Sequence, residues 1–546
     1  MRSLSPTDIR LPTEIVLMVC SYLWKQDQLS SRLVSGKLHY AATIHAFRSL
    51  RLRPDRNSTL QFREIALSEK LRTFVKEVTI ETELDPGIRF HSDREVFAVC
   101  QNFLQFLPYL ALFNNLKHLH LQFSRSSHPR DYNIEEGLQY RYLVLDIISH
   151  CAVGMWTPEN RKTIYAAELP AIWSSHMFTY THDGPALPGD SLQIKELTIS
   201  HLADYNDPRL IQSKAWNKLL RLPTLIDLKL LVGEDHVNNR TDLAVETSEF
   251  FSALPSQWLQ PDLVQKLQVL SLFYIDFWGW FPRMDLSQLG DLPTLKVLAL
   301  GRYIFTDKKQ TDWIASLGKR NKSGGLEELY LDECCIMFEV IGPLTIDGYP
   351  VQGVGINWNA DVECTRYGRR WHHVLSEWRT SMKGLKKFVM GVGDFGYPSR
   401  TIVPFCPRGP LTEDMRKASD PPEWYFGHNR HRFFADPGPK DFVIRLIDAY
   451  QSRRRSSRAV PMGNYLLGTG LTQSRRAQMR YAAYEVGLPY GWLIGNHQPT
   501  NGSRFTGIQF TNGDYDPAWA PEEKTVEFDD AAYALLMETI RDRIRS

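Results

Sequence analysis

The clearest structural pattern in this sequence is Leu326-Glu327-Glu328-Leu329-Tyr330-Leu331-Asp332-Glu333-Cys334-Cys335-Ile336. Its apolar residues follow a fixed order: apolar, two variable, apolar, one variable, apolar, with Cys334 and Ile336 extending the pattern. The same three-point spacing recurs upstream and downstream. The copies are Val75/Val78/Ile80, Leu116/Leu119/Leu121, Ile194/Leu197/Ile199, Leu225/Leu228/Leu230, Leu267/Leu270/Leu272, Leu295/Leu298/Leu300 and Leu385/Phe388/Met390. We therefore predict a series of similar buried strands.

This spacing resembles the strand segment of leucine-rich repeats. One strand and one helix per unit would give a curved parallel sheet with helices outside it. We predict an α/β fold in which residues 55–395 form an irregular leucine-rich-repeat-like solenoid, and a compact α/β domain is the alternative. Irregular intervals predict insertions or unrecognised repeats between 121 and 194 and between 331 and 385. Helices are expected at 96–106, 139–149, 215–222, 248–254, 312–319 and 372–382.

In a solenoid, the strand residues between the apolar points face the concave side. That stripe is mixed in charge toward its ends, as at His118, His120 and Glu196, and apolar or small at its centre, which suits a protein partner. Most rings of the aromatic run at 273–281 are expected in the core, with Trp278 and Trp280 partly exposed. The candidate target-binding residues are Val269, Ser271, Phe273, Trp278, Trp280, Glu328 and Tyr330.

The first fifty residues predict three short helices. Pro12 suits a first helical turn because it has no N–H to lose, and Ile15, Val19 and Leu23 recur at helical spacing. Asp27 and Ser35 are expected to cap the second and third helices. Three such helices bury little surface by themselves, so they need a partner protein or the rest of this chain.

Four segments of this region occur together in a family order. They are Leu11-Pro12-Thr13-Glu14-Ile15, Cys20-Ser21-Tyr22-Leu23, Arg32-Leu33-Val34-Ser35 and Phe47-Arg48-Ser49-Leu50. Their order and spacing resemble a fungal-style F-box, the module that binds F-box proteins to a Skp-type adaptor, although Ser31 and Gly36 depart from the family pattern. An N-terminal helical cap on the following domain is the alternative.

The resemblance implies a function for the whole chain. Residues 1–54 would bind the adaptor and, through it, a cullin, and the repeats would bind an unknown protein target. The chain would then be the non-catalytic substrate receptor of a Skp–cullin–F-box ubiquitin ligase. The candidate adaptor-binding residues are Leu11, Pro12, Ile15, Val19, Leu23, Leu33 and Val34.

Composition limits the other classes of function. The chain has 546 residues, 43% of them hydrophobic and 23% charged, with a formal net charge of +2. The small net charge makes nucleic acid an unlikely partner, because such binders rely on a strong positive field. No secretory signal and no apolar stretch of membrane-spanning length are visible. Seven cysteines without framework spacing are typical of reduced thiols, which predicts a cytoplasmic or nuclear protein without membrane contact.

No catalytic residue, metal or cofactor is predicted. The segment at 391–396 matches a dinucleotide fingerprint but lacks the following helix, and Cys334 and Cys335 should point to opposite sides of a strand. Residues 396–546 combine a Pro/Gly-rich segment with a C-terminal cap or small α+β domain, with helices expected at 441–450, 475–485 and 530–544. A non-ligase scaffold, or an enzyme with a site around His428 and His431, remains an alternative function.

Overall fold

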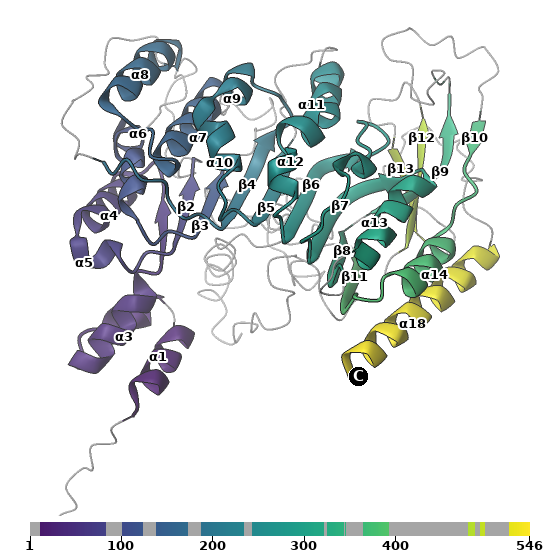
Figure 1. Cartoon of the computed structure of the whole chain (residues 1–546), viewed down its shortest axis with the longest axis horizontal. Helices are drawn as coiled ribbons and strands as arrows, with labels where there is room; N and C mark the ends of the chain where they lie inside the picture. The colour runs from purple at the N-terminus through teal and green to yellow at the C-terminus, as the bar shows by residue number, and fades with distance from the viewer. Residues whose placement is uncertain are drawn as a thin grey trace, which may run out of the picture.

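The computed structural model describes residues 11–23, 25–82, 101–123, 138–172, 187–233, 243–320, 325–332, 334–342, 344, 364–391, 479–485, 492–496 and 523–545. In these ranges the chain is a mixed α/β protein with one large, mostly parallel sheet (Figure 1). Its strands are β1 (Ser49–Leu52), β2 (Glu77–Glu81), β3 (His118–Gln122), β4 (Glu196–Ala203), β5 (Asp227–Gly233), β6 (Val269–Trp278), β7 (Val297–Phe305), β8 (Glu328–Asp332), β9 (Cys335–Ile341), β10 (Cys364–Arg366), β11 (Lys387–Gly391), β12 (Arg480–Glu485) and β13 (Trp492–Asn496).

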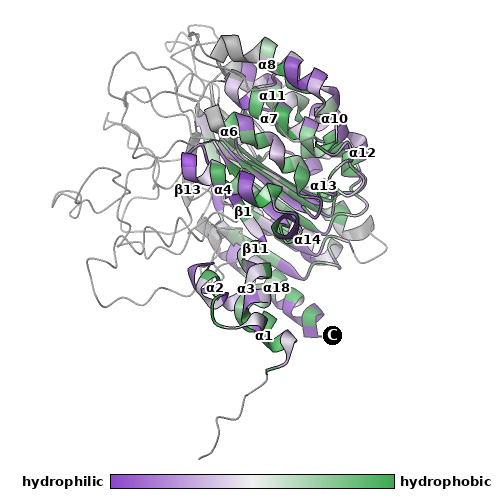
Figure 2. Cartoon of the chain, turned by 90° about the vertical axis from the view of Figure 1, so that its left-hand side faces the viewer, coloured by the Kyte–Doolittle hydropathy of each residue, from purple (hydrophilic) through white to green (hydrophobic). Residues whose placement is uncertain are grey.

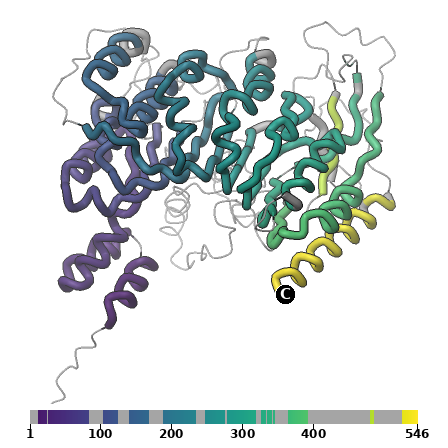
Figure 3. Tube along the Cα trace, viewed as in Figure 1, coloured from purple at the N-terminus to yellow at the C-terminus, as the bar shows by residue number. Residues whose placement is uncertain are grey.

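The order of the strands in the sheet follows the chain. From β1 to β8 each strand pairs in parallel with the next one, and β11 pairs in parallel with β8. Accordingly, the colour along the tube changes steadily from one end of the sheet to the other (Figure 3). Beyond β7 the sheet also branches to β9, which pairs in parallel with β12 and antiparallel with β10, while β12 pairs antiparallel with β13.

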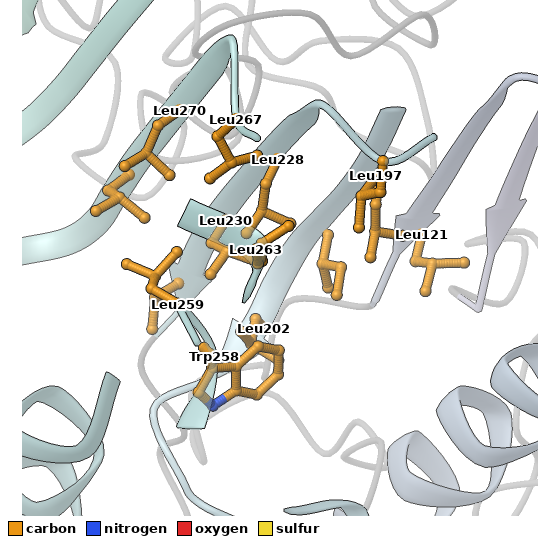
Figure 4. Close-up of a cluster of buried hydrophobic side chains, with 14 of the residues drawn as sticks. Leu121, Leu197, Leu202, Leu228, Leu230, Trp258, Leu259, Leu263, Leu267 and Leu270 are labelled. Carbon is orange, nitrogen blue, oxygen red and sulfur yellow. The ribbon is translucent and has the colours of Figure 1, made fainter. Parts of the chain in front are cut away.

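The apolar triplets stack in register across the sheet. The middle residue of each triplet lies opposite its counterparts on the neighbouring strands, and every member of this row is buried. The row is Val78, Leu119, Leu197, Leu228, Leu270, Leu298, Leu329 and Phe388. Figure 4 shows part of the resulting core, with Leu197, Leu228 and Leu270 on successive strands. The predicted strands are therefore confirmed. Their register is fixed because the same position of each triplet is buried on every strand.

The described helices between β1 and β11 gather mainly on one side of the sheet (Figure 2). Apolar residues of all of them except the short α5 join the leucine rows in one continuous core. They are α4 (Arg56–Leu67), α5 (Glu69–Arg72), α6 (Gln101–Phe106), α7 (Leu138–Ala152), α8 (Pro158–Ile172), α9 (Pro208–Gln212), α10 (Lys214–Leu220), α11 (Leu243–Gln257), α12 (Pro261–Val264), α13 (Lys308–Arg320) and α14 (Trp371–Ser381), with 3₁₀ turns η1 (Leu107–Leu112) and η2 (Leu286–Leu289). No helix in the described ranges is long and apolar enough to cross a membrane.

Helices α7, α10, α11, α13 and α14 confirm the predicted helices within a few residues at each end. Of the helix predicted at 96–106, α6 confirms the last part, and 96–100 lie outside the described residues. The two long intervals contain insertions. His118 of β3 pairs directly with Glu196 of β4, and Glu328 of β8 pairs directly with Lys387 of β11.

One C-terminal prediction is wrong. Residues 480–485 form strand β12, although the sequence predicts a helix at 475–485. Tyr481 and Ala483 join the main core, while Ala482 and Tyr484 join a second cluster on the other face of β12. A strand buried on both faces shows no alternation of polar and apolar residues, so periodicity alone does not distinguish it from a helix. The helix predicted at 530–544 is confirmed as part of α18 (Glu523–Arg545), whereas 441–450 lies outside the described residues.

A buried hydrogen-bond network joins β12, α14 and α18. The Asp529 carboxylate accepts the backbone N–H of His372 at 2.7 Å and the hydroxyl of Tyr481 at 2.7 Å. The Tyr481 hydroxyl accepts the backbone N–H of Trp371 at 2.9 Å. Because Trp371 begins α14, the network satisfies two N–H groups that have no partner inside the helix. It anchors the C-terminal helix to the far end of the sheet.

The N-terminal module consists of α1 (Thr13–Tyr22), α2 (Lys25–Ser31) and α3 (Gly36–Ala46). The predicted boundary at residue 54 needs correction, because β1 already belongs to the sheet and pairs with β2 through Leu50 and Val78. Phe47, Leu50 and Leu52 repeat the three-point spacing, so the pattern begins one unit earlier than the sequence analysis placed it. The sheet therefore starts at Ser49.

Candidate binding surfaces

The N-terminal module has a small core of its own. Val16 and Cys20 of α1 pack against Ala41 and Ala42 of α3. Buried Gln28 of α2 donates its side-chain N–H groups to the carbonyls of Cys20 and Leu23, at 2.9 and 3.0 Å, and so fixes the end of α1.

One of the two predicted helix caps is confirmed. Ser35 caps α3 by accepting the backbone N–H of Leu38 at 3.3 Å. Asp27 does not precede its helix as a cap, because α2 begins at Lys25 and Asp27 lies in its first turn.

This core leaves a large apolar surface uncovered. Leu33 is 89% exposed and Val34 is 70% exposed, and both follow α2. The N-terminal apolar face, as we call this surface, consists of the exposed residues Leu11, Pro12, Ile15, Met18, Val19, Tyr22, Leu29, Leu33 and Val34. It contains every predicted adaptor-binding residue except Leu23, which is half-buried against the small core. So many exposed apolar side chains on one small module are typical of a protein interaction site.

The sheet carries a second candidate surface, on the face that the apolar triplets do not use. The strand residues between the apolar points form two rows there, as predicted. The first row is Glu77, His118, Glu196, Asp227, Val269, Val297, Glu328 and Lys387, and the second row is Thr79, His120, Thr198, Lys229, Ser271, Ala299, Tyr330 and Val389. Most of the first row keeps some exposure, whereas most of the second row is buried.

The predicted exposure of Trp278 and Trp280 is wrong. Trp278 packs edge-on against Tyr303 with ring centroids 4.9 Å apart, and its indole N–H donates to the Gly301 carbonyl at 2.6 Å. Trp280 packs against Tyr484 of β12, with centroids 5.0 Å apart. Both tryptophans are buried because partners distant in the sequence cover them.

Three more of the predicted target-binding residues are buried and therefore not available to a target. Ser271, Phe273 and Tyr330 are buried, and the Phe273 ring lies over Gly301 of the neighbouring strand, where no side chain competes for the space. Only Val269 and Glu328 of the predicted set keep part of their surface.

A charged cluster lies on this face where β3, β4 and β5 meet. His118 Nδ1 lies 2.7 Å from Glu196 Oε2, and His120 Nε2 lies 3.2 Å from Glu196 Oε1. The Lys229 ammonium contacts Glu196 Oε1 at 2.5 Å and Asp227 Oδ2 at 3.0 Å. We refer to these five residues as the His–Glu–Lys cluster.

The cluster sets the ionisation of its two carboxyl groups in opposite directions. Burial raises the pKa of Asp227 to about 6, because Lys229 offsets the burial only in part and the Glu196 charge adds to it. Burial also opposes ionisation of Glu196, but its close contacts with the His118 and His120 imidazoles and the charge of Lys229 outweigh that effect and lower the pKa of this carboxyl. The ionised form of Glu196 is therefore the stable one.

The sequence analysis placed His118, His120 and Glu196 in one stripe but did not predict a cluster. The signal was present in the repeat alignment. His118, Glu196 and Asp227 occupy the same position of three successive copies, and His120 and Lys229 share another. Residues at one repeat position become neighbours in a parallel sheet with this register.

The predicted orientation of the two adjacent cysteines is confirmed. Cys334 lies in the main core, where its thiol donates to the Leu300 carbonyl at 3.3 Å, whereas Cys335 lies in the second cluster, so the two do point to opposite sides. His428 and His431 lie outside the described residues, as does most of the 391–396 segment.

Comparison with known proteins adds no relative. No protein-family model matches this sequence, and a search of curated proteins finds no match.

Proposed function

We propose that this chain is the substrate receptor of a Skp–cullin–F-box ubiquitin ligase. Helices α1–α3 would act as the F-box and bind a Skp-type adaptor, which links the chain to a cullin. The sheet domain, as a leucine-rich-repeat-like solenoid, would bind a protein target. The chain itself would perform no chemistry, and its contribution would be to hold the target near the ubiquitin-charged enzyme. This role would place the protein in the cytoplasm or nucleus.

The exposed N-terminal apolar face carries this proposal. Residues that repeat at helical spacing normally face a protein's own core. Here Ile15 and Val19 are exposed, while Val16 and Cys20 of the same helix supply the internal contacts. A helix that buries one face internally and leaves a second apolar face uncovered has the arrangement of a docking module.

The orientation of the module favours docking over a role as a plain cap. Figures 1 and 2 show α1 and α3 projecting away from the end of the sheet. Lys25 provides a polar tie to the sheet by donating to the Ser49 carbonyl at 3.2 Å. A cap would instead turn the exposed side chains of α1 onto the first strand.

The repeated register supports the solenoid part of the proposal. Corresponding residues of consecutive units lie on adjacent strands, with helices on one side, which is the construction of a leucine-rich-repeat array. The proposed target surface then centres on the partly exposed first row, at Val269, Val297, Glu328 and Lys387. Its mixture of apolar and oppositely charged side chains suits a protein better than a polyanion.

Adaptor capture by the purified full chain tests the proposal. We expect wild type to bind a Skp-type adaptor, and Pro12→Ala combined with Ile15→Asp to abolish capture, as should Val19→Asp alone. Leu535→Asp on α18 is the matched control, because Leu535 is 45% exposed and Val19 is 44% exposed. All variants should stay close to the wild-type melting temperature, since the altered side chains are exposed and lie outside the buried cores.

Each outcome has a definite meaning. Capture that survives both face variants would show that another surface binds the adaptor. Failure of folded wild-type protein to bind would remove the F-box assignment itself. If capture occurs, reconstitution with cullin, ubiquitin-conjugating enzyme and a candidate target separates a ligase receptor from a non-ligase scaffold.

A further inference from the structure

The His–Glu–Lys cluster has a donor set that the proposed docking function does not use. His118 and His120 project from alternate positions of β3, so both imidazoles lie on one face of the sheet. Glu196 lies opposite His118 on β4. One ligand atom from each of the three side chains lies within 4.8 Å of the other two.

His120 lacks the hydrogen bonds that a buried imidazole needs. Its side chain is only 7% exposed, and within the described part of the chain neither ring nitrogen makes a hydrogen bond of good geometry. Its Nε2 nevertheless faces Glu196 Oε1 at 3.2 Å. Burying a polar group without a well-aligned partner is unfavourable, so this orientation requires a compensating interaction. A bound cation would supply one.

We propose that His118, His120 and Glu196 form a binding site for a divalent transition-metal ion, with Zn²⁺ the best match. Two imidazoles and one carboxylate are ligands that Zn²⁺ prefers, whereas Mg²⁺ and Ca²⁺ prefer oxygen ligands. Ligand atoms around tetrahedral Zn²⁺ lie about 3.3 Å apart, so small side-chain rotations suffice. Three protein ligands leave a fourth position for water or for a side chain of a bound target.

Lys229 is the competitor for this site. Its ammonium contacts Glu196 Oε1, but it also contacts Asp227 Oδ2 at 3.0 Å. On metal binding, Lys229 would keep Asp227 and release Glu196. Removing the ammonium should therefore strengthen metal binding, which is the opposite of what loss of a merely structural residue would do. The site lies in the sheet, apart from the N-terminal module, so it does not depend on adaptor binding.

The test is Zn²⁺ titration of chelator-treated full chain against a chromophoric competitor, with Co²⁺ absorption as a second readout. Wild type should bind at this site and show a visible Co²⁺ band of tetrahedral intensity. His118→Gln should weaken binding more than about 100-fold, because it removes a ligand directly. His118 is half-exposed, so His118→Gln disturbs the fold less than His120→Asn or Glu196→Gln would. We therefore expect the His118→Gln variant to fold. Lys229→Met should tighten binding about tenfold.

The matched control is His39→Gln, which removes an exposed histidine of α3 and should leave affinity unchanged. Absence of Zn²⁺ binding by folded wild type would overturn the proposal. Equal affinity in wild type and His118→Gln would also overturn it, because the ion would then be held elsewhere. Weaker binding in Lys229→Met would contradict the role given to Lys229.

Discussion

At the scale of single residues, helix α7 carries a histidine–aspartate pair that affects stability. His150 on α7 lies one helical turn after Asp146, with His150 Nδ1 3.3 Å from Asp146 Oδ1. Burial opposes protonation of this imidazole, but its hydrogen bonds to Asp146 and the Asp146 charge outweigh that effect and raise the pKa of His150. Protonated His150 therefore stabilises the folded state.

This arrangement predicts a pH-dependent contribution to stability. A histidine whose pKa is raised on folding contributes stability that is complete below its unfolded pKa and disappears as pH rises through the folded value. The difference in unfolding free energy between wild type and His150→Gln should thus be larger at pH 5.5 than at pH 8.5. Urea denaturation at both pH values measures it. In an Asp146→Asn background the pH dependence should vanish, and a difference that grows with pH would contradict the assignment.

Residue-level prediction from sequence succeeded where one local rule decides the outcome. Ser35 caps α3, and the last two residues of each apolar triplet are buried together because their spacing of two places them on the same strand face. It failed for Trp278 and Trp280, whose environment depends on Tyr303 and on Tyr484. Sequence patterns close to a tryptophan do not reveal which distant ring will cover it.

At the scale of secondary-structure elements, the C-terminal part of the fold depends on one strand. Strand β12 contains two alanines and a basic residue, a composition that favours a helix in isolation. Pairing with β9 and burial on both faces override that preference. By contrast, α18 could be predicted because Ala532, Leu536 and Ile540 repeat at helical spacing along its buried side.

The Tyr481 hydroxyl gives β12 a specific attachment to two helices. Tyr481→Phe would remove the hydrogen bonds to the Trp371 N–H and to Asp529 while keeping the ring in the core. We expect a loss of about 1–3 kcal/mol in unfolding free energy, because buried polar groups lose a partner. Chemical denaturation measures this loss. Tyr40→Phe on exposed Tyr40 of α3 is the control and should be neutral, and equal stability of both variants would refute the network's importance.

At the scale of the whole molecule, the repeat brings together residues that the chain keeps far apart. His118 and Glu196 are separated by the insertion that contains α7 and α8, yet they face each other on β3 and β4. Sequence spacing predicted the strands but not that these two copies are neighbours, because an unrecognised strand between them was equally compatible. The direct pairing of β3 with β4 creates the His–Glu–Lys cluster.

The boundary between the N-terminal module and the sheet yields a prediction about deletions. Strand β1 is short and carries Arg51, whose side chain pairs with Glu81 at 3.1 Å, features that protect the edge of a sheet. Deleting residues 1–46 should leave β1 and give a monomeric sheet domain that does not bind adaptor. Deleting residues 1–54 should also expose β2 and remove buried Leu50 and Leu52, a loss of about 3–6 kcal/mol at 1.5–3 kcal/mol for each side chain.

Light scattering after size exclusion, together with thermal unfolding, separates the two outcomes. The shorter deletion should match the full chain in melting temperature within a few degrees, and the longer one should melt lower and associate through β2. Equal behaviour of both deletions would mean that β1 contributes nothing to the sheet. A loss of adaptor capture seen only with the longer deletion could reflect damage to the sheet. The shorter deletion is therefore the one that bears on docking, because it removes α1–α3 and leaves the register of β1 and β2 intact.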